Sequence, residues 1–317
     1  MTASSILIMT PVMPRIADGC AALAPCIRWS ADQPLAQALD GHPPPRALAV
    51  TGRTVDAALL DQLPGLEIIA NMGVGYDNVD VAAAAARKIV VCNTPDVLTD
   101  EVADFTLGLL LMAIRRMGAA ERFLRAGQWA KGAFPLSPTL RGRSIGILGM
   151  GRIGKAVAQR LSGFGVAISY FGRHRQTDLP FAYLDDPVAL AGAVDTVISI
   201  LPGGEATRHV IDAAFLAALG PEGIVINVGR GSSLDEAALI EALRHGVVAG
   251  AGLDVFEHEP HPASELLTLE NVVLMPHIGS ASQHTRAAMA QLVVDNIASW
   301  FRDGRALTPV PAVQVGA

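Results

Sequence analysis

The sequence predicts an α/β protein with two domains, each built on a doubly wound parallel sheet. Its 317 residues exceed the usual size of a single domain. Short β-rich runs alternate with helical stretches rich in alanine and leucine, which is the rhythm of parallel βαβ units. This alternation occurs in two successive arrays, and only the second array carries a glycine fingerprint. We therefore expect one domain to be inserted into the other.

The first array contains predicted strands at residues 6–9, 47–50, 67–70 and 89–92. A long amphipathic stretch follows at residues 100–126, where apolar side chains recur at helical spacing: Val102, Phe105, Leu109, Met112 and Ile114. We expect a single helix here, joining the two domains. Its apolar stripe at residues 107–114 is expected to pack in the core or against a second subunit.

The second array contains predicted strands at residues 144–148, 167–171, 196–200, 224–227 and 250–255. These runs read as buried strands separated by helices, which is typical of a nucleotide-binding sheet. A final helix is expected near residues 283–302. The boundaries then fall near 98 and 284, so that residues 1–98 and 284–317 form one domain and residues 99–283 form the inserted one.

Composition narrows the class of protein. Hydrophobic residues make up 51% of the chain and charged residues 17%, which indicates a folded globular protein. The longest apolar runs are too short to span a bilayer, so no membrane is expected as a partner. The net charge of −6 offers no basic surface for a phosphate backbone, so no nucleic acid is expected either.

The cysteines and the start of the chain bear on the compartment. Cys20, Cys26 and Cys92 are few, odd in number and lack CxxC spacing, which favours neither a disulfide framework nor a zinc site. The first residues lack the basic region of a signal peptide and continue into a predicted strand. We therefore expect a cytoplasmic protein.

A glycine fingerprint, GMGRIG, follows the strand predicted at residues 144–148 and opens a helix. In such a motif Gly149 permits a tight turn, Gly151 lets the backbone approach a pyrophosphate, and Gly154 lets helix and strand pack closely. The helix N-terminus, with Arg152 and Ile153, adds partial positive charge. The inserted domain is thus predicted to be a Rossmann domain that binds a nicotinamide cofactor, and Val228, after a later strand, is also assigned to that site.

The end of the next predicted strand indicates which cofactor is bound. An NAD enzyme carries an acidic residue here for the ribose 2′-hydroxyl, whereas this chain reads GRHR at residues 172–175. An arginine can form charge-assisted bonds to a 2′-phosphate, while a carboxylate would repel it. Arg173 and Arg175 therefore favour NADPH over NADH, although solvated surface arginines are the alternative.

Three further segments, at residues 227–231, 254–260 and 275–280, each follow a β-rich run, where ligands bind in parallel sheets. Reduction of a 2-oxo acid needs a cation for the substrate, a proton donor for the developing alkoxide, and a group that keeps the donor protonated. Arg230, His277 and Glu259 fit these needs, because a carboxylate beside histidine favours imidazolium and orients the ring. Taken singly, each residue fits an ordinary structural role equally well.

The run EHEPH at residues 257–261 could suggest a metal cluster. Pro260 prevents the regular helix that would align His258 and His261 on one face, so no metal is expected. The run also contains two acids that could pair with His277, namely Glu257 and Glu259.

Several motifs together resemble those of the D-2-hydroxyacid dehydrogenases: GVGYDN at 73–78, TPDVLTD at 94–100, the glycine fingerprint, GRG at 229–231, LDVF at 253–256 and PHIGS at 276–280. The resemblance covers nearly the whole chain. It is closest to the NADPH-dependent glyoxylate/hydroxypyruvate reductases and the hydroxyphenylpyruvate reductases.

The resemblance implies a role for each matching residue. Arg230 anchors the substrate, His277 is the acid/base, and its partner stands directly before a proline, which favours Glu259. Backbone N–H groups of Val74 and Gly75 cradle the substrate carboxylate, and Asp254 accepts from the nicotinamide carboxamide. The outer domain is expected to be flavodoxin-like and to bind the substrate.

The resemblance also implies a homodimer formed largely by the cofactor domains. The predicted helix at 100–126 and the apolar segment at 129–136 are expected to form the contact. Some related reductases send an aromatic side chain from this segment towards the active site of the neighbouring subunit. By its position in the sequence, Phe134 is expected to be that residue here. Two alternatives stay open for the function: a nicotinamide-sensing interaction protein, such as the corepressors built on this fold, and an NAD-linked dehydrogenase of another small acid.

Overall fold

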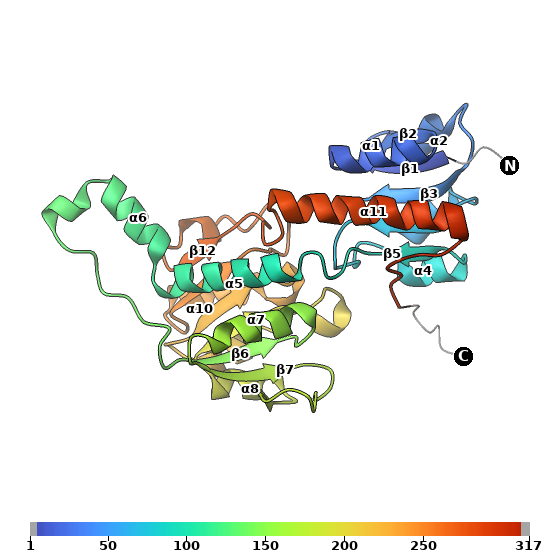
Figure 1. Ribbon diagram of the computed structural model, residues 1–317. Helices are drawn as coiled ribbons and strands as arrows, with labels where there is room; N and C mark the ends of the chain where they lie inside the picture. Colours follow the sequence, from blue (N-terminus) through green and yellow to red (C-terminus); the bar gives the residue numbers. More distant parts are fainter. Residues whose placement is uncertain (1–4, 312–317) are drawn as a thin grey trace. The chain divides into compact units, whose positions relative to one another are not determined.

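The computed structural model describes residues 5–311 and divides them into two compact units. The first unit comprises residues 5–98 and 282–311, and the second comprises Thr99–Ala281 (Figure 1). Within residues 5–311, no helix combines the length and the apolarity needed to cross a bilayer. Each unit is organised around its own parallel sheet.

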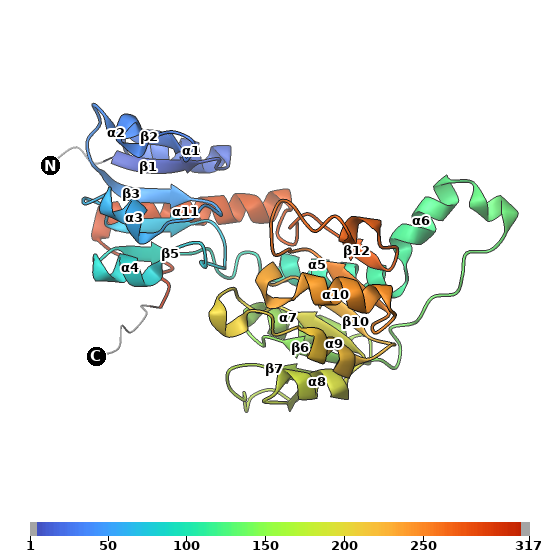
Figure 2. The same cartoon turned by 180° about the vertical axis from the view of Figure 1, so that it is seen from behind.

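The first unit contains a five-stranded parallel sheet in the order β2-β1-β3-β4-β5, which is the flavodoxin-like order. The strands are β1 (Ser5–Thr10), β2 (Cys26–Ser30), β3 (Pro45–Val50), β4 (Ile68–Asn71) and β5 (Val90–Cys92). Helices α1 (Pro14–Leu23) and α11 (Gln283–Asp303) pack together on one face, while the other face carries α2 (Leu35–Leu39), α3 (Ala57–Asp61) and α4 (Val81–Ala86) (Figures 1 and 2). The flavodoxin-like prediction is confirmed.

The second unit contains a seven-stranded parallel sheet in the order β12-β11-β10-β9-β6-β7-β8. The strands are β6 (Ser144–Leu148), β7 (Ala167–Phe171), β8 (Ala182–Tyr183), β9 (Thr196–Ser199), β10 (Ile224–Asn227), β11 (Gly250–Leu253) and β12 (Val272–Leu274). The strand order reverses beside β6, which is where ligands bind in sheets of this kind. The predicted Rossmann sheet is therefore confirmed.

Helices cover both faces of the second sheet. On one face lie α5 (Thr99–Ile114) and α7 (Arg152–Ser162), and on the other lie α8 (Pro187–Ala193), α9 (Ala213–Leu219) and α10 (Glu236–Arg244) (Figure 2). Short 3-10 turns occur at Glu205–Thr207, Gly231–Ser233 and Leu266–Thr268. Both faces of the sheet are covered, which explains why its central strands read as continuous apolar runs.

The prediction of one continuous helix over residues 100–126 is wrong, because the chain breaks the helix between residues 114 and 117. The chain forms α5 and then a separate α6 (Met117–Arg125), because Arg116 adopts a left-handed conformation with φ +51°. Leu109, Leu110 and Ile114 of α5 are almost fully buried in the core of the second unit. The apolar stripe at 107–114 therefore packs in the core of the chain.

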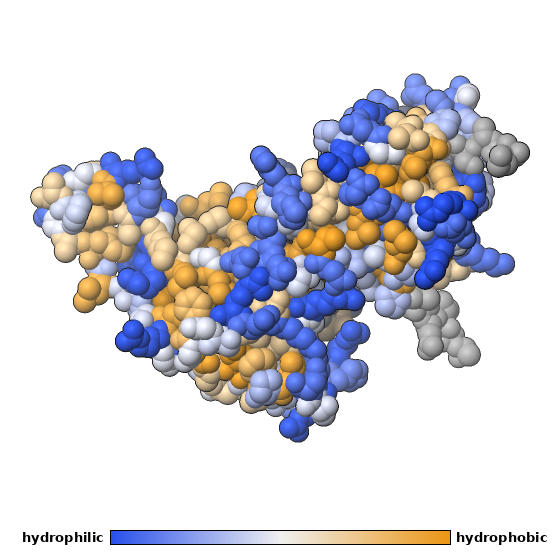
Figure 3. Space-filling view, viewed as in Figure 1, coloured by the Kyte–Doolittle hydropathy of each residue, from blue (hydrophilic) through white to orange (hydrophobic). Residues whose placement is uncertain are grey.

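Helix α6 and the segment after it project from the second unit as an arm, residues 117–137 (Figure 1). A 3-10 turn, Gln128–Lys131, lies in this arm, and α6 buries none of its residues. Apolar side chains are nevertheless frequent on it (Figure 3), with Leu124, Trp129 and Leu136 exposed by 56%, 69% and 100%. The arm thus presents apolar surface that its own chain does not cover.

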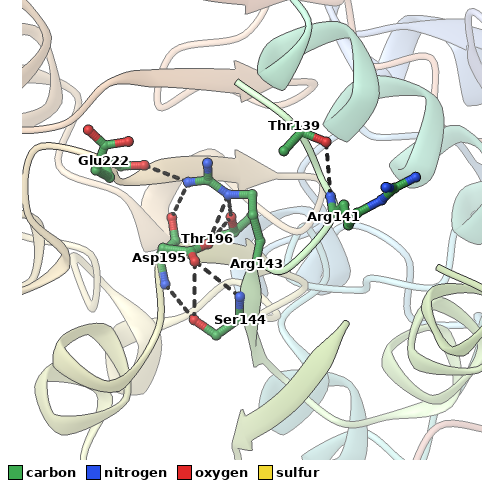
Figure 4. A network of polar contacts seen from close by, with 7 residues as sticks. All are labelled: Thr139, Arg141, Arg143, Ser144, Asp195, Thr196 and Glu222. Carbon is green, nitrogen blue, oxygen red and sulfur yellow. Dashed lines mark hydrogen bonds and ion pairs between the residues drawn. The ribbon is translucent and has the colours of Figure 1, made fainter. Parts of the chain in front are cut away.

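A buried arginine joins the amino ends of three neighbouring strands in the second unit. The guanidinium of Arg143 donates to Thr196 Oγ1 at 2.7 Å and to the carbonyls of Asp195 and Glu222, and it forms an ion pair with the Asp195 carboxylate at 2.8 Å (Figure 4). The other Asp195 oxygen accepts from the Ser144 N–H at 3.1 Å. This network therefore holds together the amino ends of β6, β9 and β10, at the opposite end of the strands from their carboxyl ends.

Candidate active site

The glycine loop connects β6 to α7 and fits a dinucleotide. Gly149 has φ +99°, and a Cβ there would lie 3.0 Å from the Ile200 carbonyl oxygen. A Cβ at Gly154 would lie 2.3 Å from the Gly149 carbonyl oxygen, so helix and loop touch. At Gly151, by contrast, nothing in the described chain apart from its two chain neighbours comes within 4 Å of a Cβ position. Space is therefore left open in front of the N-terminus of α7, as a pyrophosphate requires.

The segment after β7 lies beside this glycine loop. Gln176 Nε2 donates to the Met150 carbonyl at 2.7 Å, and its N–H donates to the Tyr170 hydroxyl at 2.7 Å. These bonds hold the intervening Arg173 and Arg175, which are exposed and have no hydrogen-bond or ion-pair partner among residues 5–311. Gln176 was not predicted from the sequence; its role depends on a contact 26 residues away.

The loop after β10 carries Arg230 and is held by Asn227. This asparagine is fully buried; its Nδ2 donates to the Arg230 carbonyl at 3.0 Å, and its Oδ1 accepts from the Gly229 N–H at 3.1 Å. Val228 lies between them with its side chain 9% exposed, and its N–H donates to Ser199 in β9. In the sequence, an asparagine at the end of an apolar strand is the feature that could have indicated this positioning role.

His277 follows β12 and is held by Asp254, which follows β11. The His277 N–H donates to the Asp254 carbonyl at 2.9 Å, while the N–H groups of Ile278 and Gly279 donate to the two Asp254 carboxylate oxygens at 2.7 and 2.8 Å. Burial raises the pKa of Asp254, although these N–H bonds oppose the shift. The structure thus places Asp254, 2% exposed, as a support for the His277 loop.

His277 and Glu259 form a direct pair. Nδ1 of His277 lies 2.7 Å from Glu259 Oε2, and the other oxygen, Oε1, accepts from the Phe256 N–H at 3.1 Å. Burial would raise the pKa of Glu259, but the His277 hydrogen bond, the His277 and Arg230 charges and the Phe256 N–H together lower it. Nε2 of His277 has no partner among the described residues, so it can face a substrate.

Three neighbouring strands, β10, β11 and β12, bring Arg230, Glu259 and His277 to one edge of the sheet. The Arg230 charge is the smallest of the influences that lower the pKa of Glu259. Glu257, the other acid in the run, instead lies 2.5 Å from Nε2 of His209. The structure therefore selects Glu259, and not Glu257, as the partner of His277.

In the first unit, the loop after β4 forms a row of oriented peptide groups. The carbonyls of Gly73, Val74 and Gly75 accept from the Thr94 N–H at 2.8 Å, Asn93 Nδ2 at 2.8 Å and Asn71 Nδ2 at 3.0 Å, respectively. In a trans peptide the N–H points away from the carbonyl of the preceding residue. The N–H groups of Val74, Gly75 and Tyr76 therefore point away from these anchors.

No acceptor within residues 5–311 takes the N–H groups of Val74, Gly75 or Tyr76. Free N–H groups can donate to an anion, and the resemblance implies that those of Val74 and Gly75 cradle the substrate carboxylate. The sequence did not identify Asn71 or Asn93 as the residues that orient it. Both stand at or just after the ends of the adjacent strands β4 and β5.

Comparisons with known proteins place these features in a family. The family model for the NAD-binding domain of the D-isomer specific 2-hydroxyacid dehydrogenases matches residues 107–279. Glyoxylate/hydroxypyruvate reductase A of Arabidopsis thaliana is 46% identical over 80% of this chain and 82% of its own length. Hydroxyphenylpyruvate reductase of Plectranthus scutellarioides is 44% identical over 83% and 85%.

Solved structures agree with these relatives. The NADPH-dependent glyoxylate/hydroxypyruvate reductase of Sinorhizobium meliloti, in complex with NADP and malonate, has a TM-score of 0.93 and 50% identity, covering 98% of this chain and 97% of its own. A 2-hydroxyacid dehydrogenase of Ketogulonicigenium vulgare has a TM-score of 0.88 and 40% identity, covering 98% and 99%. The chain therefore belongs to the D-isomer specific 2-hydroxyacid dehydrogenase family.

Proposed function

We propose that this protein uses NADPH to reduce a small 2-oxo acid to the D-2-hydroxy acid. The observation that carries the proposal is the His277–Glu259 pair, joined at 2.7 Å at the carboxyl ends of the strands, where Arg230 also stands. Relatives at 44–50% identity are glyoxylate/hydroxypyruvate and hydroxyphenylpyruvate reductases, which act on acids of this class. Glyoxylate and hydroxypyruvate are the leading substrates, and an arylpyruvate is the alternative.

In this reaction, different residues of the chain bind the substrate, donate the proton and keep the donor protonated. NADPH, when bound, supplies a hydride to C2 of the 2-oxo acid. Protonated His277 gives a proton from Nε2 to the oxygen on C2, while the Glu259 carboxylate on Nδ1 stabilises the imidazolium and orients the ring. Arg230 and the N–H groups of Val74 and Gly75 are assigned to the carboxylate and carbonyl of the substrate.

The cofactor is assigned to the glycine loop and the segment after β7. Gly149, Gly151 and Gly154, with the N–H groups of Arg152 and Ile153, would hold the pyrophosphate at the N-terminus of α7. Arg173 and Arg175 would bind the 2′-phosphate, since both guanidinium groups lack a partner within the described chain. Val228 is assigned to the same site, and Asp254 to the nicotinamide carboxamide.

We further propose that the enzyme is a cytosolic homodimer. The arm, residues 117–137, leaves Leu124, Trp129 and Leu136 exposed, and a second copy of the chain is the occupant that we assign to this surface. Phe134 packs edge-on against Phe123 of its own chain, with ring centroids 5.4 Å apart. All three cysteines are free thiols, which suits the reducing cytosol.

The test follows NADPH and NADH absorbance with glyoxylate, hydroxypyruvate and hydroxyphenylpyruvate, and determines the handedness of the product. His277→Ala serves as the control for contaminating reductases, because loss of a general acid costs about 10² to 10⁴ in rate. We expect NADPH-dependent turnover that this variant abolishes. Binding of NADPH without turnover of any of the three acids would instead favour a nicotinamide-sensing protein.

A further inference from the structure

A buried carboxylate lies beside the turn that carries Glu259. Glu236, the first residue of α10, is 5% exposed, and its Oε1 accepts a 2.6 Å hydrogen bond from the backbone N–H of Glu257. A carboxylate is costly to bury, and the N-terminus of a helix lowers that cost only in part. A charged acceptor forms a stronger bond to an N–H than a neutral one does. Glu236 is therefore well suited to fix this particular N–H.

The same turn is pressed against the loop that carries Arg230. A Cβ at Gly231 would lie 1.9 Å from both the carbonyl carbon and the oxygen of Phe256, and 2.5 Å from the Glu257 nitrogen. Only glycine allows this approach. The peptide between Phe256 and Glu257 is thus held between Gly231 and the Glu236 carboxylate.

The side chain of Glu257 is held as well. Its Oε1 lies 2.5 Å from Nε2 of His209, whose own backbone N–H donates to the Ser232 carbonyl at 2.9 Å. Arg208 lies at 4.0 Å from the same oxygen. The carboxylate of Glu257 is therefore engaged by His209 and Arg208, while the carboxylate of Glu259 pairs with His277.

We propose that Glu236 is a positioning residue for the proton-transfer pair: by holding the Glu257 N–H, it fixes the turn from Phe256 to Glu259 and so places Glu259 Oε2 against His277 Nδ1. The Phe256 N–H bond to Glu259 Oε1, at 3.1 Å, closes this turn from within. The inference rests on the proposed function, because it assigns Glu236 to the same acid–base group. Charged groups that also act on Glu259 are His277, Arg230 and Asp254.

The experiment compares Glu236→Ala, Glu236→Gln and the parent enzyme in kcat against pH. Glu236→Ala removes the acceptor, so Glu259 loosens and stabilises the imidazolium less; the decline of kcat on the alkaline side should then start at lower pH, with kcat down about tenfold or more. Glu236→Gln keeps an acceptor oxygen, so its kcat and the pH at which kcat declines should both lie close to those of the parent. Glu241→Ala, on an exposed part of the same helix, is the matched control.

A double variant separates positioning from a general structural role. If Glu236 acts through Glu259, then Glu236→Ala adds no further pH shift in a Glu259→Gln background. A fall in kcat with an unshifted pH profile, or shifts that add in the double variant, would overturn the proposal. NADPH affinity, measured by fluorescence, should stay within about twofold in every variant.

Two further outcomes are distinguishable. If Glu236→Ala does not fold, Glu236→Asp withdraws the acceptor by one methylene while it keeps the charge, and the same pH shift is expected. A parent enzyme without turnover of any 2-oxo acid would contradict the proposed function itself, whereas an active parent with an unshifted Glu236 variant contradicts only the positioning role.

Discussion

His277 has φ +53°, a left-handed backbone conformation that is uncommon for residues other than glycine. Such a conformation costs about 1–3 kcal/mol and persists where the surroundings impose it. Here Asp254 supplies three hydrogen bonds to the N–H groups of residues 277–279. The imidazole of the same residue pairs with Glu259, so the strained backbone lies within the candidate acid–base pair.

Glu259→Gln should change the pH dependence of reduction. The pKa of Glu259 is lowered, so its negative charge is present from neutral pH down to acid and is lost only as the pH falls through that lowered value. Removing the charge destabilises the imidazolium that donates the proton. The alkaline decline of kcat should therefore begin at lower pH than in the parent enzyme, as measured by steady-state kinetics. An alkaline limb that does not move would contradict the assignment of Glu259.

Arg173→Ala should raise the KM for NADPH far more than the KM for NADH. The lost charge-assisted bond to the 2′-phosphate is worth about 1.5–3 kcal/mol, which corresponds to about tenfold or more. Arg302→Ala, an exposed arginine of the first unit, is the control. Equal effects on both cofactors would show that Arg173 is an ordinary surface arginine.

Asn93→Ala should weaken substrate binding without changing cofactor binding. Its Nδ2 holds the Val74 carbonyl at 2.8 Å and thereby orients the Gly75 N–H. Loss of one such bond is expected to raise the KM for the 2-oxo acid by about tenfold, with the NADPH KM unchanged. Gln62→Ala, an exposed side chain of the first unit, should leave both values as they were. An unaltered KM for the 2-oxo acid in Asn93→Ala would contradict the assignment of the Val74 and Gly75 N–H groups to the substrate.

Among the secondary-structure elements, strands β6, β9 and β10 are joined at their amino ends by Arg143, while the candidate site lies at the carboxyl ends (Figure 4). This separation lets stability and activity be tested independently. A buried ion pair that loses one partner leaves the other charge uncompensated, which is costly even where the pair itself adds little.

Arg143→Leu should therefore lower the free energy of unfolding of the second unit by about 2–4 kcal/mol. The range lies below that of fully buried pairs because the Asp195 side chain is 33% exposed. Urea denaturation measures the loss, and kcat of the folded fraction should equal that of the parent. The control is Arg141→Leu, because Arg141 is exposed and its backbone N–H, which donates to the Thr139 hydroxyl, is kept in the variant. Equal stability of the two variants would refute the structural role.

At the scale of the whole molecule, the arm is the part that its own chain leaves uncovered. Leu124→Glu combined with Leu136→Glu should convert the expected dimer to monomers, because two charges would be placed in an apolar contact. Light scattering at micromolar concentration measures the state. Leu23→Glu, an exposed leucine of the first unit, should leave the dimer intact. A parent protein that scatters as a monomer would end the proposal.

The substrate role of Phe134 is a separate matter. In Phe134→Ala, the ratio of kcat/KM between hydroxypyruvate and hydroxyphenylpyruvate should change if the ring shapes the pocket of a neighbouring subunit. Within its own chain the ring contacts Phe123 and lies 5.8 Å from the Arg116 guanidinium. An unchanged ratio would confine Phe134 to these contacts in the arm.

The sequence by itself determined what depends on local pattern. Central strands such as β6 and β10 were predicted at their observed bounds because burial on both faces makes them continuously apolar. The glycine fingerprint likewise encodes a local turn. Edge strands β2 and β8 were not predicted, since β8 is short and β2 contains exposed residues such as Arg28. The break falls at Arg116, a residue type that does not itself end helices, although Gly118 follows two residues later.

Only the tertiary structure decided which residues control the site. The resemblance favoured Glu259 over Glu257, but the physical basis is tertiary: Glu257 pairs with His209, 48 residues away, and Glu259 pairs with His277, 18 residues away. The loops that carry Val74 and Arg230 are oriented by buried amides, and the turn before Glu259 by Glu236. Such contacts join ends of neighbouring strands, so their partners are set by sheet order and register, which no local stretch of sequence contains.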